Sequence, residues 1–154
     1  MQHKRSTKAP YALAAGAGKA MGWLESTITL KASSSEIGVT EATLRPGQEP
    51  PLHRHKNEDE WFMVLDGEMT FHVGGENYFG KAGAFVSFPR GIPHTFTVES
   101  ESARFLVITT PGGFEHMFEL APKTPEEAVR AMTAFGMEVV GPHPREAAVL
   151  ARRG

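Results

Sequence analysis

Short apolar runs separated by turn residues fill the chain after about residue 22, and this pattern restricts the fold more than any other feature. The stretch "EWFMVLDGEMTFHVGGENYFG" is the clearest example, with Asp66-Gly67 and Gly74-Gly75 between its apolar runs. Asp-Gly and Gly-Gly pairs suit the backbone angles of tight hairpin turns. We therefore expect two consecutive hairpins and three strands in series here, within an all-β antiparallel sandwich or barrel.

Further strands are expected on both sides of this stretch. In "EMTFHV" the alternation places Met69, Phe71 and Val73 on one face and His72 on the other. His72 is therefore expected to face outward and is not a candidate metal ligand. The other expected strands lie in "WLESTITLKA", "GVTEATLRPG", "GAFVSFP", "HTFTV" and "ARFLVITTP".

The tail of the chain has a different pattern. In "KTPEEAVRAMTAFGME", Thr124 is placed as a helix N-cap, Pro125 as the first helical residue and Gly136 as a stop. Glu127 completes a capping box with Thr124. We expect one amphipathic helix, followed by a turn and a short helix or a frayed end. The apolar stripe that should pack on the barrel consists of Val129, Met132 and Phe135.

Composition limits the partners of this chain. Its 154 residues, 40% of them hydrophobic, suit one globular domain over residues 1–154. The formal net charge of -2 gives no basis for a nucleic-acid partner, because phosphate binding needs a clustered basic surface. No apolar run approaches a membrane span, and Pro10 and Gly16 interrupt what would be a signal sequence. We expect a small-molecule partner and a cytoplasmic location.

Two histidines one residue apart open the stretch "HRHKNEDEW". On a strand, His53 and His55 point to the same face, so both imidazoles can reach one ion. Glu60 begins the next apolar strand, where an inward carboxylate needs a partner that a cation can supply. His94, in the turn "FPRGIPHTF" between two strands, can return to the same place as a fourth ligand.

Three imidazoles and one carboxylate suit one divalent first-row metal: iron, manganese, nickel, cobalt, copper or zinc. Because the chain has no cysteine, thiolate ligands and a cysteine nucleophile are excluded. Four protein ligands leave open positions on an octahedral ion, which indicates a catalytic or ligand-binding site more than a closed structural one.

Three charged neighbours of these ligands have other expected roles. Glu58 and Asp59 are rivals of Glu60 for the carboxylate position. Their expected role is a solvated turn that adds negative potential near the ion. Arg54 lies between the two histidines and points to the opposite face, where a structural ion pair is expected.

Two stretches resemble the two motifs of the cupin family. "GQEPPLHRHKNEDEWFMVLDG" fits the first motif: a glycine, five residues, His-x-His, four residues, Glu, six residues and a glycine. "GAFVSFPRGIPHTFTV" is similar to the second motif, with Gly83, Pro89, Gly91 and His94 at the expected spacings. Val98 stands where the family often has asparagine, a residue that is not a metal ligand.

The resemblance implies a cupin double-stranded β-helix, or jelly-roll, barrel over about residues 23–111. A C-terminal helical extension over about residues 112–154 would follow it, and family habit implies a homodimer. In the family pattern, the metal ligands are the residues that correspond to His53, His55, Glu60 and His94.

The flanking stretches "YALAAGAGKAMGWL" and "TTPGGFEHMFEL" are similar to single-domain, quercetinase-like (quercetin 2,3-dioxygenase-like) cupins. This second resemblance implies a metal-dependent dioxygenase acting on a flavonol or another enolisable aromatic substrate. Glu60 would be both metal ligand and catalytic base, taking the proton of the metal-bound substrate oxygen. The resulting anion would react with dioxygen.

Several aromatic side chains are expected to line a substrate cavity above the metal, although most aromatic residues of a sandwich belong to its core. An apolar cup favours a planar or aromatic substrate. Residues 112–120 either form a lid over the mouth or pack on the outer wall, and Gly112 and Gly113 permit hinge motion. The candidate pocket residues are Phe62, Phe71, Phe85, Phe96, Phe114 and Phe118.

Two other classes of function stay open at this point. A non-catalytic cupin would use the same cup to bind or sense a small ligand, with or without a metal. A cupin isomerase or decarboxylase would need more inward-facing polar and charged side chains than these apolar strands offer. Oxygen uptake with an enolisable aromatic compound separates the dioxygenase from both.

Overall fold

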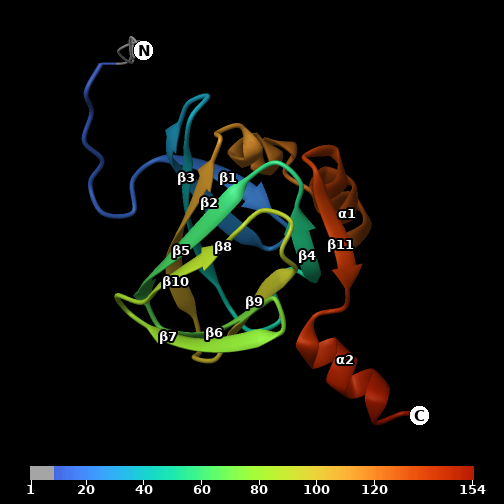
Figure 1. Ribbon diagram of the computed structural model, residues 1–154. Coiled ribbons are helices and arrows are strands. Elements are labelled where there is room, and N and C mark those ends of the chain that lie inside the picture. Colours follow the sequence, from blue (N-terminus) through green and yellow to red (C-terminus); the bar gives the residue numbers. More distant parts are fainter. Residues whose placement is uncertain (1–8) are drawn as a thin grey trace.

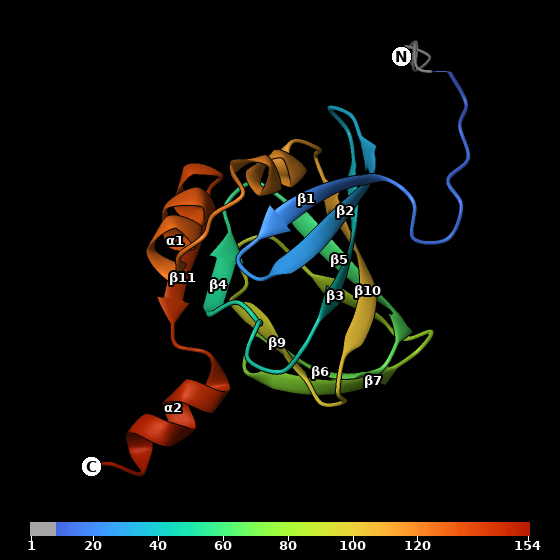
Figure 2. The same ribbon diagram turned by 180° about the vertical axis from the view of Figure 1, so that it is seen from behind.

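Two antiparallel sheets face each other in the computed structural model, which describes residues 9–154 (Figure 1). They curve around a common interior, as the view from behind also shows (Figure 2). The six-stranded sheet has the order β1 (Lys19–Trp23), β2 (Ser26–Ser33), β3 (Gly38–Leu44), β10 (Ala103–Thr110), β5 (Asp59–Asp66) and β8 (Phe85–Phe88). The five-stranded sheet has the order β11 (Met137–Gly141), β4 (Leu52–His55), β9 (His94–Val98), β6 (Glu68–Val73) and β7 (Glu76–Lys81). The expected all-β jelly-roll is confirmed.

The two glycine turns differ in what they join. Gly74-Gly75 closes a hairpin between β6 and β7, in which Val73 pairs with Glu76. Asp66-Gly67 instead carries the chain from β5 in one sheet to β6 in the other, so the first expected hairpin is wrong. Gly67 has a φ of 83°, and a Cβ there would collide with the carbonyl oxygen of Ser102. The glycine therefore permits the tight corner by which the chain passes from one sheet to the other.

The barrel interior is packed with aromatic side chains from both sheets. The ring of Phe62 on β5 lies with its centroid 4.8 Å from that of Phe88, 5.4 Å from Phe96 and 5.3 Å from Phe105. Each aromatic pair of this kind contributes about 1 kcal/mol beyond the burial of its surface. The contact between Phe62 and Phe96 joins the two sheets across the interior of the barrel.

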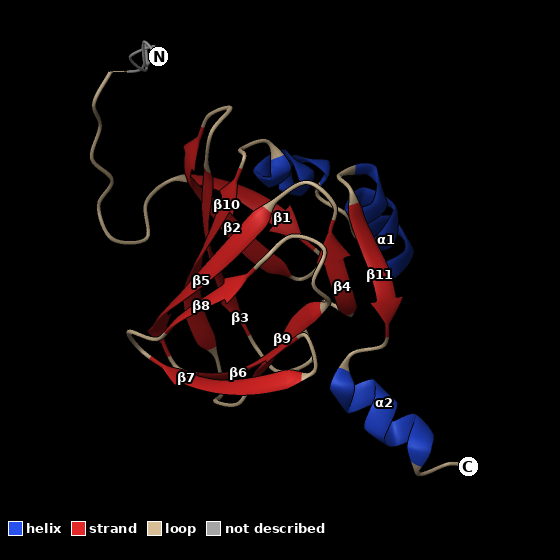
Figure 3. Ribbon diagram, viewed as in Figure 1, coloured by secondary structure: helices blue, strands red, loops and turns tan. Residues whose placement is uncertain are grey.

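Three helical segments follow the barrel strands: η1 (Phe114–Leu120), α1 (Pro125–Ala134) and α2 (Pro144–Ala151). Figure 3 shows η1 and α1 together at one end of the barrel, whereas α2 extends away from it. α1 begins as expected, with the backbone N–H of Glu127 donating to the Thr124 hydroxyl at 3.2 Å.

The buried face of α1 differs from the expected stripe. Ala128, Ala131 and Met132 are buried, whereas Val129 is 42% exposed. The stripe is rotated because α1 packs against both β11 and η1, a double contact that favours small residues on its inner face. Phe135, at the end of the helix, still packs against the buried cluster that α1 forms with η1 and β11.

Two edge strands were missed by the sequence pattern. β1 precedes β2 and pairs with it, and β11 lies within the segment expected to be a helical extension. β11 pairs with β4, with Met137 opposite His55 and Val139 opposite His53. The C-terminal segment therefore supports the strand that carries both histidines.

Within residues 9–154, no helix is long and apolar enough to cross a membrane. The basic start of the chain, residues 1–8, lies outside the described residues.

Candidate metal centre and cavity

The alternation of β4 directs its two histidines inward and the residue between them outward. His53 and His55 are 4% and 1% exposed. Arg54 faces the other side, where its Nε donates to Glu138 Oε2 at 2.8 Å. The structural ion pair expected for Arg54 is therefore present.

Three strands from both sheets bring four ligand-type side chains together. His94 begins β9 and pairs in register with His53 on β4, while Glu60 comes from β5 in the facing sheet. One ligand atom from each of His53, His55, Glu60 and His94 lies within 4.8 Å of the others, and all four side chains are buried. This quartet fits a metal site of nitrogen and oxygen donors.

Outer hydrogen bonds orient two of the imidazoles. Nδ1 of His53 lies 2.8 Å from the carbonyl oxygen of Pro51, and Nδ1 of His94 lies 2.9 Å from that of Ile92. A carbonyl only accepts, so in both rings Nδ1 carries the proton and Nε2 keeps its lone pair. These are the tautomers a metal site requires.

Glu60 lies between the other two rings. Its Oε2 is 2.9 Å from His94 Nε2 and 3.0 Å from His55 Nε2. The contact with His55 lacks the alignment of a hydrogen bond, and both ring nitrogens of His55 are buried without a hydrogen-bond partner in the described chain. Buried polar atoms of this kind are rare unless an unseen ion or water satisfies them.

Burial and neighbouring charges separate the proton affinities of the quartet. Burial, together with His94, lowers the pKa of His53 to about 3. Burial also acts to lower the pKa of His55, but the carboxylates of Glu60 and Glu58 outweigh it and raise that pKa to about 9. For Glu60, burial acts to raise the pKa, but His55 and His94 hold it well below its usual range. A proton on His55 therefore balances the ionised Glu60.

The two acids before Glu60 do not form the expected solvated turn. Glu58 is only 7% exposed, and its Oε2 lies 3.6 Å from Nδ1 of His55. Asp59 faces outward and accepts hydrogen bonds from the backbone and the side chain of Arg90. The expectation is wrong for Glu58 because adjacent residues of an extended chain face opposite sides, so Glu58 and Glu60 face inward and Asp59 outward.

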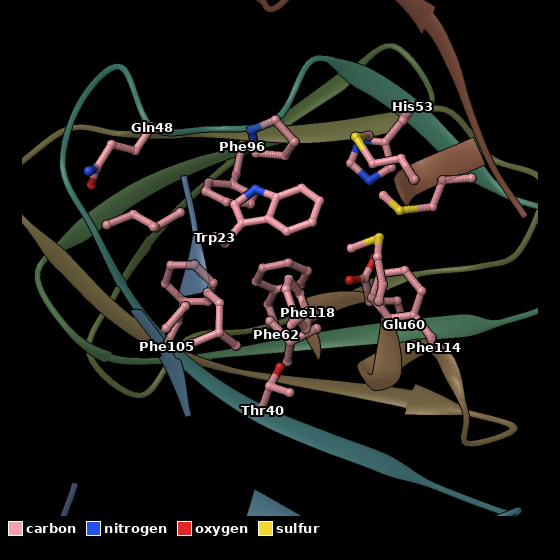
Figure 4. A pocket seen from close by; sticks show the side chains of 18 of the residues that line it. Trp23, Thr40, Gln48, His53, Glu60, Phe62, Phe96, Phe105, Phe114 and Phe118 are labelled. Atoms are coloured by element: carbon pink, nitrogen blue, oxygen red, sulfur yellow. The ribbon is translucent and has the colours of Figure 1, made fainter. Parts of the chain in front are cut away.

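A cavity extends from the quartet into the barrel. Its volume is about 80 Å³, and its wall is apolar except for a few side chains, among them Thr40, Gln48, His53 and Glu60. Figure 4 shows His53 and Glu60 at one end of this cavity and Gln48 at the other, with aromatic rings between them. In the described chain, no lysine or arginine lines it.

Four of the six expected pocket residues line this cavity: Phe62, Phe96, Phe114 and Phe118. Phe71 does not: it is fully buried in the core and packs against Phe62, with ring centroids 5.7 Å apart. Phe85 does not either, because β8 turns it outward, where it is 59% exposed. The sequence pattern missed Trp23, Gln48 and Phe105, which also line the cavity.

Other expectations concern the segment after the barrel and the remaining strand histidine. η1 covers the cavity with Phe114, Met117 and Phe118, and whether it opens as a lid stays a prediction.

His72 lies outside the quartet, as expected, and its ring is hydrogen-bonded to Asn77 and Thr97.

A protein-family model described as "Cupin domain" matches residues 40–109, a span that contains the whole quartet. Residues 40–109 of this chain are a cupin domain. A solved relative, an RmlC-like cupin from Shewanella frigidimarina NCIMB 400, superposes with a TM-score of 0.60 at 14% identity, covering 68% of this chain and 93% of that chain. This likeness concerns the fold alone.

Curated relatives of this cupin include enzymes. Over 117 residues it is 30% identical to the quercetin 2,3-dioxygenase of Bacillus subtilis (strain 168), covering 73% of this chain and 35% of the relative. Over 112 residues it is 29% identical to the oxalate decarboxylase OxdC of the same strain, covering 64% of this chain and 28% of the relative. The chain thus spans about a third of the length of these relatives.

Proposed function

We propose that this cupin is a metal-dependent dioxygenase acting on a small, uncharged, enolisable substrate, aromatic or otherwise apolar. The observation that carries the proposal is the buried His53, His55, Glu60 and His94 quartet at the end of an apolar cavity. A divalent ion held there would make a bound hydroxyl or enol oxygen more acidic and would supply the redox chemistry of dioxygen.

In this reaction Glu60 is both ligand and base. Its low pKa keeps the carboxylate ionised at neutral pH, so it can accept the proton of an acidified substrate oxygen. Its Oε2 lies 3.0 Å from His55 Nε2 and 2.9 Å from His94 Nε2, so one ion can reach all three atoms. The aromatic walls exclude water from the anion that remains after proton transfer.

The charge of the cavity favours this class over decarboxylation of a small acid. A dianion such as oxalate would need a cation besides the metal, and no lysine or arginine lines the described cavity. Gln48, at the far end, offers an amide group to an uncharged substrate (Figure 4).

The volume of the cavity favours the small members of the class. About 80 Å³ is small beside the roughly 300–1,000 Å³ of typical ligand pockets, which suits a single ring or a compact diketone. A three-ring flavonol would require η1 to move away. A flavonol is therefore a less favoured substrate than a small enol, despite the quercetin dioxygenase relative.

The test combines metal analysis with oxygen uptake. Untagged protein purified without chelator should carry near-stoichiometric metal, and Glu60→Ala and His94→Ala should lose it. His116→Ala is the matched control, because His116 is exposed on η1 and outside the quartet.

Protein loaded in turn with iron, manganese, nickel or cobalt is then given small enols, β-diketones and flavonols in an oxygen electrode. We expect uptake with at least one small enol. Glu60→Gln should lower its rate by about 100-fold or more. Loaded protein that takes up no oxygen with any of them would make this cupin a ligand-binding module.

A further inference from the structure

The three histidines of the quartet differ in what holds their outer nitrogen. Nδ1 of His53 and of His94 each lies within 2.9 Å of the carbonyl oxygen two residues earlier in the chain. His55 has no such carbonyl, and its Nδ1 is buried without a hydrogen-bond partner in the described chain. Its orientation must come from another group.

Glu58 lies where it can orient the His55 ring. Its side chain is 9% exposed, and its Oε2 faces Nδ1 of His55 at 3.6 Å. Oε2 also lacks a hydrogen-bond partner in the described chain. Two complementary polar atoms thus face each other in the interior, about 0.7 Å beyond a hydrogen bond.

We propose that Glu58 is the positioning residue of the metal ligand His55, accepting a hydrogen bond from its Nδ1 when Nε2 holds the ion. The inference rests on the proposed metal site and not on the dioxygenase reaction. A metal-bound imidazole keeps its proton on the other nitrogen, and a carboxylate that accepts this proton fixes the tautomer and strengthens the donor.

The arrangement makes the three imidazoles unequal donors. His55 is backed by a carboxylate, whereas His53 and His94 are backed by neutral carbonyls. Glu58 and Glu60 together also compensate the two charges of a divalent ion. A neutral centre avoids the cost of burying net charge among aromatic side chains.

Neighbouring acids supply a matched pair of variants. Glu58→Gln keeps the shape of the side chain but removes its charge beside His55. Asp59→Asn removes the same charge one residue later, from a carboxylate that faces Arg90 instead. Both variants have the same net charge, so only the contact with His55 distinguishes them.

Co²⁺ is the probe, with affinity measured by competition against a chromophoric chelator and geometry by its visible absorption bands. We expect the dissociation constant to rise about tenfold or more in Glu58→Gln, and further in Glu58→Ala. The absorption bands should shift in both variants. Asp59→Asn should keep the affinity and the spectrum of the wild type.

Melting temperatures of the metal-free variants separate a lost contact from a damaged fold. Wild-type affinity and spectrum in Glu58→Gln would overturn the inference, as would equal losses in Asp59→Asn. If wild-type protein binds no Co²⁺, the proposed metal site itself fails and the inference falls with it. If metal binds as expected but oxygen uptake is absent, only the proposed reaction fails.

Discussion

His55 carries the proton that competes with a metal ion for the centre. Its pKa of about 9 means that it is still protonated at pH 8, where an ordinary histidine is neutral. Metal binding requires the neutral ring. At pH 8 we therefore expect Co²⁺ binding to release about one proton per ion, falling toward none as the pH rises well above 9.

Titration calorimetry in two buffers of different ionisation enthalpy measures this proton count. Glu58→Gln is the internal comparison, because it removes a carboxylate that raises the pKa of His55 but keeps all four ligands. Its proton release at pH 8 should be smaller. Equal heats for the wild type in both buffers would contradict the assignment of the proton to His55.

The quartet could be predicted from the sequence because alternation directs His53 and His55 to one face of a strand, and the spacing of the two cupin motifs singles out Glu60 and His94. Glu58 was missed because it was assigned to a solvated turn, although it lies two residues before Glu60 and alternation places both side chains on one face.

Alternation alone does not identify the aromatic residues that line the cavity. Alternation directs Phe71 inward, but only the packed barrel shows that Phe71 contacts Phe62 without lining the cavity itself.

At the scale of single elements, η1 is fastened to the barrel by a buried carboxylate and by an exposed ion pair between Glu119 and Lys19 of β1. Glu115 is 2% exposed, and it accepts hydrogen bonds from the hydroxyl of Ser33 on β2 and from the backbone N–H of Gly113. A Cβ on Gly38 would collide with this carboxylate, so the glycine at the start of β3 leaves room for it. The carboxylate thus joins the cavity cover to β2 and packs against the start of β3.

Loss of this anchor should loosen the cover over Trp23, whose ring meets Phe118 edge to face with centroids 5.4 Å apart. We expect Glu115→Ala to increase acrylamide quenching of Trp23, measured in a Trp61→Phe background. It should also lower stability by about 1–3 kcal/mol, because the anchor bonds are lost. Glu126→Ala, which removes an exposed acid on α1, is the control. Equal quenching in both variants would show that Glu115 does not hold η1.

Elements with local signals could be predicted, and elements defined by their neighbours could not. α1 carries its own capping box, so its start followed from the sequence. β1 and β11 are edge strands whose pairing depends on β2 and β4, and their own residues show no clear alternation. Asp66-Gly67 was misassigned because a turn motif does not reveal whether the next strand stays in the same sheet.

For the whole molecule, metal binding should appear as thermal stability. An ion that binds only the folded quartet adds about 2.7 kcal/mol at a concentration 100 times its dissociation constant. That corresponds to a rise in melting temperature of roughly 5–11 °C for a chain of this size. Differential scanning fluorimetry with and without Co²⁺ measures the rise, and chelator should reverse it. His94→Ala should show none, and an equal rise in this variant would place the ion elsewhere.

The quartet also connects parts of the chain that no covalent bond joins. Glu60 belongs to one sheet and the three histidines to the other, and His53 and His94 come from separate stretches of the chain. A bound ion would therefore close loops in the unfolded chain, as a disulfide does. A protein with no cysteine would gain a cross-link between its two sheets that a reductant leaves intact and a chelator dissolves.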